Sequence, residues 1–204
     1  FDGLPWVFTA GVEHPVFHGA KSFRRKAVGL AQHYFSGAKT PLTVGEGDVL
    51  FAYVYLDPAD PPREIMLQFN DGSWEHRAYW GENVIEWGAD GTASRFRKGD
   101  LPLLGEWVRL EVPVGEVGLK PGSAINGWAF TQHGGTVYWD HAGIVTKTPQ
   151  TGRPYRSLRR WELVLKETKV GRDGVPKPIL EILDRKPEDR DEAARKSLQD
   201  YFVE

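Results

Sequence analysis

Apolar and polar side chains alternate along most of the chain between residues 6 and 145. Between Leu50 and Leu56, for example, aliphatic and aromatic residues alternate. Successive side chains of a strand point to opposite faces, so a period of two predicts strands that each bury one face. We therefore expect an all-β fold, an antiparallel β-sandwich. The expected strands are 6–9, 21–26, 31–35, 48–56, 64–69, 74–80, 93–96, 107–112, 125–132 and 136–145.

Turn signals separate several of these strands. Asn70-Asp71-Gly72 and Gly134-Gly135 supply residues that readily adopt a positive φ. Each signal lies between two alternating runs, which is typical of a hairpin. We expect the chain to reverse its direction at both places.

The end of the chain has a different pattern. Residues 1–152 hold 30 charged side chains, whereas residues 153–204 hold 24 in about a third of that length. Such a step in composition usually marks a domain boundary, so we expect a sandwich over residues 1–148 and a charged helical tail over 149–204. Apolar spacing predicts short helices at 158–165, 179–183 and 188–202. Because short helices are marginal alone, we expect them to pack onto the sandwich.

Composition excludes several classes of function. The chain has no cysteine, so disulfides, cysteine-ligated metals and thiol catalysis are excluded. Its net charge of −2 and its lack of a basic block argue against a nucleic-acid partner. The longest apolar run, Val49–Leu56, is far shorter than the roughly 20 residues of a membrane-spanning helix. The chain begins at Phe1 rather than Met, so we expect it to be a piece of a longer protein.

Catalytic signatures are absent from the sequence. It contains no nucleophile elbow, zinc-protease helix, P-loop or complete dinucleotide fingerprint. Two carboxylate pairs, Glu75 with Glu86 and Glu64 with Asp71, are candidates for a glycosidase, but the sequence does not give their separation. We predict that the protein is not an enzyme.

Aromatic residues are concentrated on the predicted strands, and they occur on both faces of those strands. A sugar ring packs its C–H face on an aromatic ring, and its hydroxyls need directional partners such as amides. If strands 48–56, 64–69 and 74–80 are neighbours, such side chains form a platform of Trp80, Trp74, Tyr55, Tyr53, Gln68, His76 and Arg77. Within it, Arg77 would favour carboxylated or sulfated sugars. The alternative is that these aromatics belong to the sandwich core.

Two short segments point to a known family. Gly19-Ala20-Lys21-Ser22 near the start, and Tyr138-Trp139-Asp140-His141-Ala142-Gly143-Ile144 near the end of the body, resemble the galactose-binding-like jelly rolls of carbohydrate-binding modules. The resemblance implies a jelly-roll sandwich with a structural Ca²⁺ between its first and last strands. It implies Asp140 as a ligand, with Asp2 and the backbone around Lys21 as weaker ones. Alternatively, Asp140 hydrogen-bonds a strand end.

A longer resemblance covers residues 16–202. The runs FAYVYLDPADPPREIMLQFNDGSWEHRAYWGENVIEWGADG and LGEWVRLEVPVGEVGLKPGSAINGWAFTQHGGTVYWDHAGI, with the tail LEILDRKPEDRDEAARKSLQDYFVE, are similar to a module of large planctomycete proteins. Those proteins also carry a cytochrome-c-like domain and planctomycete-specific domains of unknown function. The resemblance implies an exported, extracytoplasmic parent, whose other domains are partners. This chain has no Cys-x-x-Cys-His motif, so no haem function transfers to it.

These observations lead to one main hypothesis and one alternative. The main hypothesis is a non-catalytic, carbohydrate-binding-like module that holds an exported multidomain protein at a polysaccharide, including acidic or sulfated ones. The alternative is a structural module without a glycan ligand, whose exposed face docks on neighbouring domains of the parent.

Overall fold

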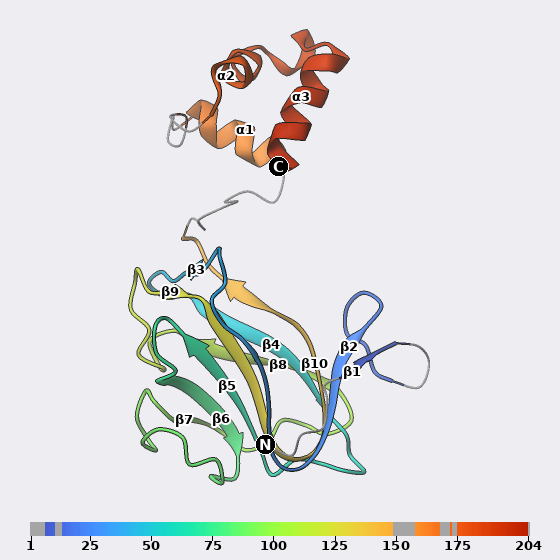
Figure 1. The fold of residues 1–204 in the computed structure, drawn as a ribbon, viewed down its shortest axis with the longest axis vertical. Helices are drawn as coiled ribbons and strands as arrows, with labels where there is room; N and C mark the ends of the chain where they lie inside the picture. The colour runs from blue at the N-terminus through green and yellow to red at the C-terminus, as the bar shows by residue number, and fades with distance from the viewer. Residues whose placement is uncertain (1–6, 11–13, 149–157, 168–171, 173–174, 204) are drawn as a thin grey trace. The chain divides into compact units, whose positions relative to one another are not determined.

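The computed structural model describes residues 7–10, 14–148, 158–167, 172 and 175–203. Contacts divide the chain into two compact units, residues 1–151 and residues 152–204. The first unit consists of strands and the second of short helices (Figure 1). The strands are β1 (Val7–Thr9), β2 (Ser22–Phe35), β3 (Leu42–Thr43), β4 (Val49–Leu56), β5 (Glu64–Asn70), β6 (His76–Gly81), β7 (Phe96–Gly99), β8 (Trp107–Pro113), β9 (Ala124–Ile125) and β10 (Gly127–Val145).

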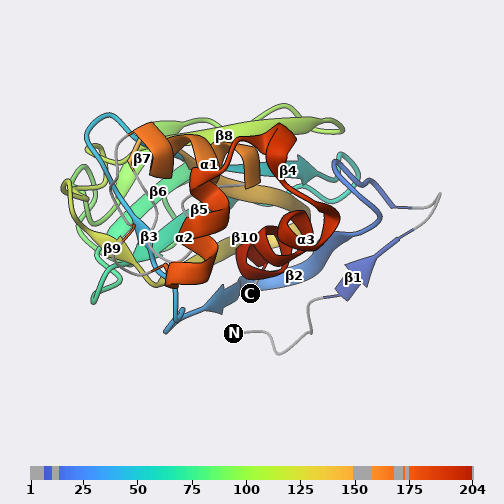
Figure 2. The same ribbon diagram turned by 90° about the horizontal axis from the view of Figure 1, so that it is seen from above.

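Strand β10 takes part in both layers of the first unit. It pairs with β2 along most of its length, with β5 over residues 127–133 and with β4 over residues 137–145. One layer continues from β5 to β6 and β7, and the other continues from β4 to β8. Figure 2 shows β8 beside β4 and β2 beside β10. Only the β6–β7 pairing is parallel among the described strands, so the predicted antiparallel sandwich is confirmed.

The two predicted hairpins have different outcomes. The Asn70 turn is confirmed, because β5 and β6 pair antiparallel on either side of it. The Gly134-Gly135 hairpin is wrong, because both glycines lie inside the continuous strand β10. Both have a φ of 72°, and a Cβ on Gly135 would lie 2.3 Å from the backbone nitrogen of Pro62. The pair makes a bulge where β10 passes from one layer to the other, and this bulge bends the strand without reversing it.

The core lies between the two layers. The aliphatic face of β4 is fully buried there, together with Leu110 and Val112 of β8. Three tryptophans, Trp80, Trp128 and Trp139, belong to the same cluster. The alternation in β4 therefore identified the buried face correctly. What the alternation left open was the role of the aromatic residues.

The second unit contains the three predicted helices. They are α1 (Leu158–Glu167), α2 (Lys177–Asp184) and α3 (Glu192–Val203), with a short 3-10 turn, η2 (Pro187–Asp189), before α3. Trp161, Leu165, Leu183 and Leu198 are buried against one another. The unit thus has a small core of its own, and the packing of its helices onto the sandwich stays a prediction. Within the described residues, no helix is long and apolar enough to cross a membrane.

Candidate functional site

The register of β5 and β6 decides which side chains share a face. Trp80 lies opposite Ile65 and His76 lies opposite Phe69, and this face is turned to the core. Trp80 is only 8% exposed. His76 contacts the Asp71 carboxylate at 3.0 Å and the Val117 carbonyl at 2.6 Å. Our placement of Trp80 and His76 on an open platform is therefore wrong.

The opposite face of the same strands carries Gln68 and Arg77, which lie directly across from each other. A pocket of about 340 Å³ opens above them. Side chains from β2, β5, β6 and the loops beside β6 contribute to it. Its lining residues are Gln32, Tyr34, Gln68, Trp74, Arg77 and Trp87. Three of the predicted site residues, Trp74, Gln68 and Arg77, are thus brought together on this outer face.

Three aromatic side chains form the walls of this pocket. Tyr34 is 56% exposed, and its ring meets the Trp74 ring edge to face with a centroid distance of 5.9 Å. Trp87 packs against a small buried cluster that includes Met66 and Tyr79. The pocket therefore offers both exposed and half-buried aromatic surface.

The polar side chains at the base of the pocket form a connected network. Arg77 Nε donates to Gln68 Oε1 at 2.9 Å, and Gln68 Nε2 donates to Thr131 Oγ1 at 2.8 Å and to Gln32 Oε1 at 3.3 Å. Arg77 also forms a two-point contact with the Glu75 carboxylate, at 3.1 and 3.2 Å. The hydrogen bond from Arg77 holds the pKa of Glu75 below its usual range. Each amide of this network has a fixed orientation.

Glu64 anchors the loop that carries Trp87. Its side chain is completely buried, and its Oε2 accepts hydrogen bonds from the backbone nitrogens of Val84 at 2.6 Å and Ile85 at 2.8 Å. Burial raises the pKa of Glu64 to about 7. A second contact, from the Tyr79 hydroxyl to Asp90 at 2.8 Å, holds the far end of the loop. The fold thus fixes the loop at two points around Trp87.

Tyr53 and Tyr55 lie in the other layer, on β4. That strand pairs with β8 and β10 rather than with β5, so these tyrosines do not join Gln68. Phe17 stacks on Tyr53 with a centroid distance of 3.7 Å. Our prediction that both tyrosines belong to the same platform is wrong, because it assumed that β4 and β5 are neighbours.

Asp140 holds the segment before β2. Its Oδ2 accepts hydrogen bonds from the backbone nitrogens of Phe17 and His18, both at 3.0 Å. Asp2 lies outside the described residues, and among those described no three His, Asp or Glu residues gather as metal ligands would. Calcium binding stays a prediction, which melting in calcium against chelator would check.

Three of the four carboxylates considered for a glycosidase have other contacts. Glu64 is buried as described, and Glu75 is paired with Arg77. Asp71 accepts hydrogen bonds from His76 and from the Ser123 hydroxyl at 3.1 Å. The serine meets the carboxylate rather than the imidazole, which is not the order of a nucleophile and its base.

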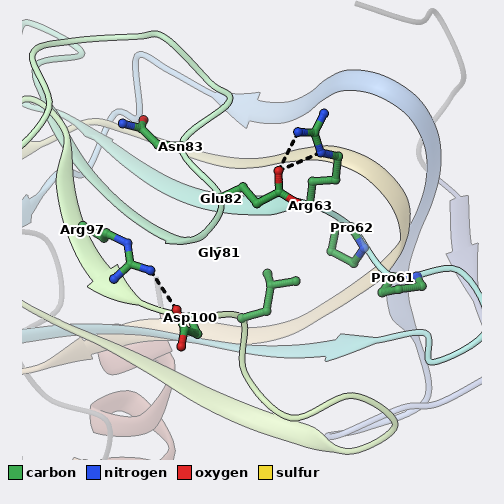
Figure 3. Close-up of a pocket in the computed structure, with 9 residues that line it drawn as sticks. Pro61, Pro62, Arg63, Gly81, Glu82, Asn83, Arg97 and Asp100 are labelled. Atoms are coloured by element: carbon green, nitrogen blue, oxygen red, sulfur yellow. Dashed lines mark hydrogen bonds and ion pairs between the residues drawn. The ribbon is translucent and has the colours of Figure 1, made fainter.

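A larger pocket, of about 820 Å³, lies near the start of β5 and the end of β6. Figure 3 shows Arg63 joined to Glu82 on one side and Arg97 joined to Asp100 on the other. Its lining residues are Pro61, Pro62, Arg63, Gly81, Glu82, Asn83, Arg97, Asp100 and Leu101. No aromatic side chain lines it, and its charged groups pair with each other. We therefore regard the smaller, aromatic pocket as the candidate site.

Gln32, Tyr34 and Trp87 were missed by the sequence reasoning. Gln32 and Tyr34 alternate on a predicted strand, but the sequence does not reveal that β2 lies near β5 through β10. Trp87 lies in an irregular loop, where no periodicity applies. A tryptophan among polar and glycine residues was the one signal available for it.

Comparisons with known proteins give similarities of fold only. No protein-family model and no curated protein sequence matches the chain. A solved structure of carbohydrate-binding modules from the beta-sandwich super family is 11% identical, with a TM-score of 0.43 over 70% of this chain and 54% of that one. The chain thus spans about half the length of that structure.

Two further solved structures have similarly low sequence identities and TM-scores. A family 16 carbohydrate-binding module is 14% identical, with a TM-score of 0.38 over 71% of this chain and 87% of that one. The CBM22-1 xylan-binding domain of Xyn10C from Paenibacillus barcinonensis is 15% identical, with a TM-score of 0.34 over 70% and 80%. At these levels neither the family nor the ligand of those proteins carries over to this chain. By its own structure the chain is an antiparallel β-sandwich with an aromatic, amide-lined pocket on one outer face.

Proposed function

We propose that the pocket between Trp74, Trp87 and Tyr34 binds a polysaccharide without acting on it chemically. The observation that supports this is the grouping of aromatic rings and amide side chains around one open pocket. Aromatic rings suit the C–H faces of sugars, and amides suit their hydroxyls. The volume of about 340 Å³ falls at the lower end of small-molecule sites, which run from roughly 300 to 1,000 Å³.

The expected affinity is weak. One ring stacked on one aromatic side chain contributes on the order of 1 kcal/mol, by analogy with other aromatic pairs. A few such contacts with several hydrogen bonds give a dissociation constant between about 1 mM and 1 μM, which corresponds to about 4 to 8 kcal/mol. Weak binding suits a module that keeps a larger protein near an abundant polymer.

Our proposal for the parent protein and its location rests on the sequence resemblance alone. We propose that residues 1–148 form a carbohydrate-binding-like module of an exported, extracytoplasmic protein, and that residues 149–204 lead to its next domain. In that setting the sandwich would supply attachment, and other domains of the parent would supply any chemistry.

The test is affinity electrophoresis of the chain through gels that contain a panel of neutral and charged polysaccharides. Trp74→Ala and Trp87→Ala should lose the retardation by the polymer that the native chain binds. Trp107→Ala is a matched control, since Trp107 is half-buried on the outer face of the other layer. No retardation of the native chain by any polymer would favour the structural-module alternative, whereas equal loss in all three variants would contradict the assignment of binding to this pocket.

A further inference from the structure

Of the described residues that line the aromatic pocket, only Arg77 is charged. Its side chain is 8% exposed, and the Glu75 carboxylate with which it pairs is 60% exposed. The guanidinium makes its hydrogen bonds to Gln68, to Glu75 and to the Ser94 carbonyl, the last at 2.9 Å. The positive charge at the base of the pocket is therefore already balanced, and the balancing carboxylate lies at the surface.

The loop after β6 keeps Arg77 in place. Gly88 has a φ of +79°, and a Cβ there would lie 2.8 Å from Arg77 Nη1 and 2.3 Å from the Ser94 carbonyl oxygen. Only glycine allows the loop backbone to approach the guanidinium this closely. Arg77 is thus packed between its own strand and this loop, so it cannot turn toward a ligand without moving the loop.

The hydrogen-bond network also decides which end of each side-chain amide faces a donor and which faces an acceptor. A guanidinium can only donate hydrogen bonds, so Gln68 must turn its oxygen toward Arg77 and its nitrogen toward Gln32. Gln32 then accepts through Oε1, which leaves its Nε2 donors for the pocket. Arg77 therefore reaches the ligand only indirectly, by making Gln32 a donor.

We propose that Glu75 is a specificity-determining residue, which neutralises Arg77 and makes the pocket select uncharged glycans with an acceptor oxygen at Gln32. This inference rests on the proposed glycan-binding function. It replaces the expectation that Arg77 selects acidic sugars, because the charge of Arg77 is already used. An anionic sugar approaching Trp74 would meet the exposed carboxylate of its neighbour Glu75.

The experiment compares polymers that share a backbone and differ in charge. The pairs are hydroxyethyl and carboxymethyl cellulose, esterified and de-esterified homogalacturonan, and desulfated and sulfated carrageenan. The native 204-residue chain, Glu75→Gln and Glu82→Gln are run in gels that contain each polymer. Glu82 is the matched control, since it pairs with Arg63 outside the aromatic pocket. A second variant, Glu75→Ala, and melting curves of all variants guard against a folding defect.

The native chain should be retarded more by the neutral member of a pair. Glu75→Gln should gain affinity for the anionic member by about threefold to tenfold, the effect of removing one exposed negative charge beside the pocket and leaving the charge of Arg77 unbalanced. Added salt should reduce that gain, and Glu82→Gln should not show it. Equal or stronger binding of anionic polymers by the native chain, or the same gain in Glu82→Gln, would overturn the role of Glu75 while leaving glycan binding intact. No binding of any polymer by any variant would instead overturn the proposed function, and this inference with it.

Discussion

Both layers of the sandwich carry aromatic side chains on their outer faces, yet the chain covers one of these faces and leaves the other open. On the β4 face, Phe17 stacks on Tyr53, and His14 contacts the Tyr138 hydroxyl at 3.2 Å. On the β5–β6 face, Trp74 and the other aromatics surround a pocket. An aromatic side chain that points away from the core is therefore not sufficient to mark a binding site. What matters is whether a segment of the same chain already occupies it.

The anchors of the neighbouring segments explain this difference. Asp140 accepts hydrogen bonds from Phe17 and His18 and so holds their segment against the β4 face. Glu64 instead holds the base of the loop that carries Trp87, so that Trp87 lines the pocket. On each face, a carboxylate that accepts hydrogen bonds from backbone nitrogens holds a segment in place. On the β4 face the held segment covers the aromatic side chains, whereas on the β5–β6 face it leaves the pocket open.

The largest expected effect comes from a residue that lies on the core side of the open face. Trp80→Ala should lower the free energy of unfolding by about 3 to 5 kcal/mol, because it leaves a large cavity. Urea denaturation followed by circular dichroism would measure it. A loss under about 1 kcal/mol, with glycan binding abolished, would show that Trp80 belongs to the open face after all.

Glu64→Gln should change how the stability of the sandwich depends on pH. The folded-state pKa of about 7 lies above the ordinary value of 4.5. The folded state favours the protonated form of Glu64. The contribution of this group to the free energy of unfolding is therefore fully present below pH 4.5 and is lost as the pH rises to about 7. This pKa shift corresponds to a loss of about 3 kcal/mol in unfolding free energy across that pH range.

Urea unfolding at several pH values would measure this dependence. The fall in stability across that window should disappear in Glu64→Gln. It should persist in Glu82→Gln, whose exposed carboxyl has a pKa lowered by a hydrogen bond from Arg63. An unchanged fall in the Glu64 variant would show that another group titrates in this window.

The smallest expected effect concerns the covered face. Phe17→Ala should cost on the order of 1 kcal/mol in unfolding free energy, because it removes the stack on Tyr53. Glycan retardation should stay unchanged. As a control, Val28→Ala removes an apolar side chain that is 87% exposed and should alter the stability by less than about 0.5 kcal/mol. A loss of glycan binding in Phe17→Ala would place a ligand surface on the covered face.

The candidate site was only partly predictable. Trp74, Gln68 and Arg77 were identified because strands 64–69 and 74–80 were expected to be neighbours, and the Asn70 turn, a local feature, does pair them. Trp80 was misplaced because both faces of its strand carry bulky residues, so alternation alone could not show which face is buried. Tyr53 was misplaced because the order of strands in a sheet depends on distant pairings.

The sequence by itself determined where most of the strands lie, the buried face of β4 and the three helices, because these depend on periodicities within a few residues. It did not show that the expected strands 21–26 and 31–35 are one strand, β2, or that residues 42–43 form the short strand β3. Only the tertiary structure decided that Gly134-Gly135 bends one long strand, since that outcome depends on Pro61 and Pro62 packing against the bulge. It also decided that Gln32, Gln68 and Trp87 meet at one pocket. These residues come from separate parts of the chain, and β10, lying between β2 and β5, brings their strands together.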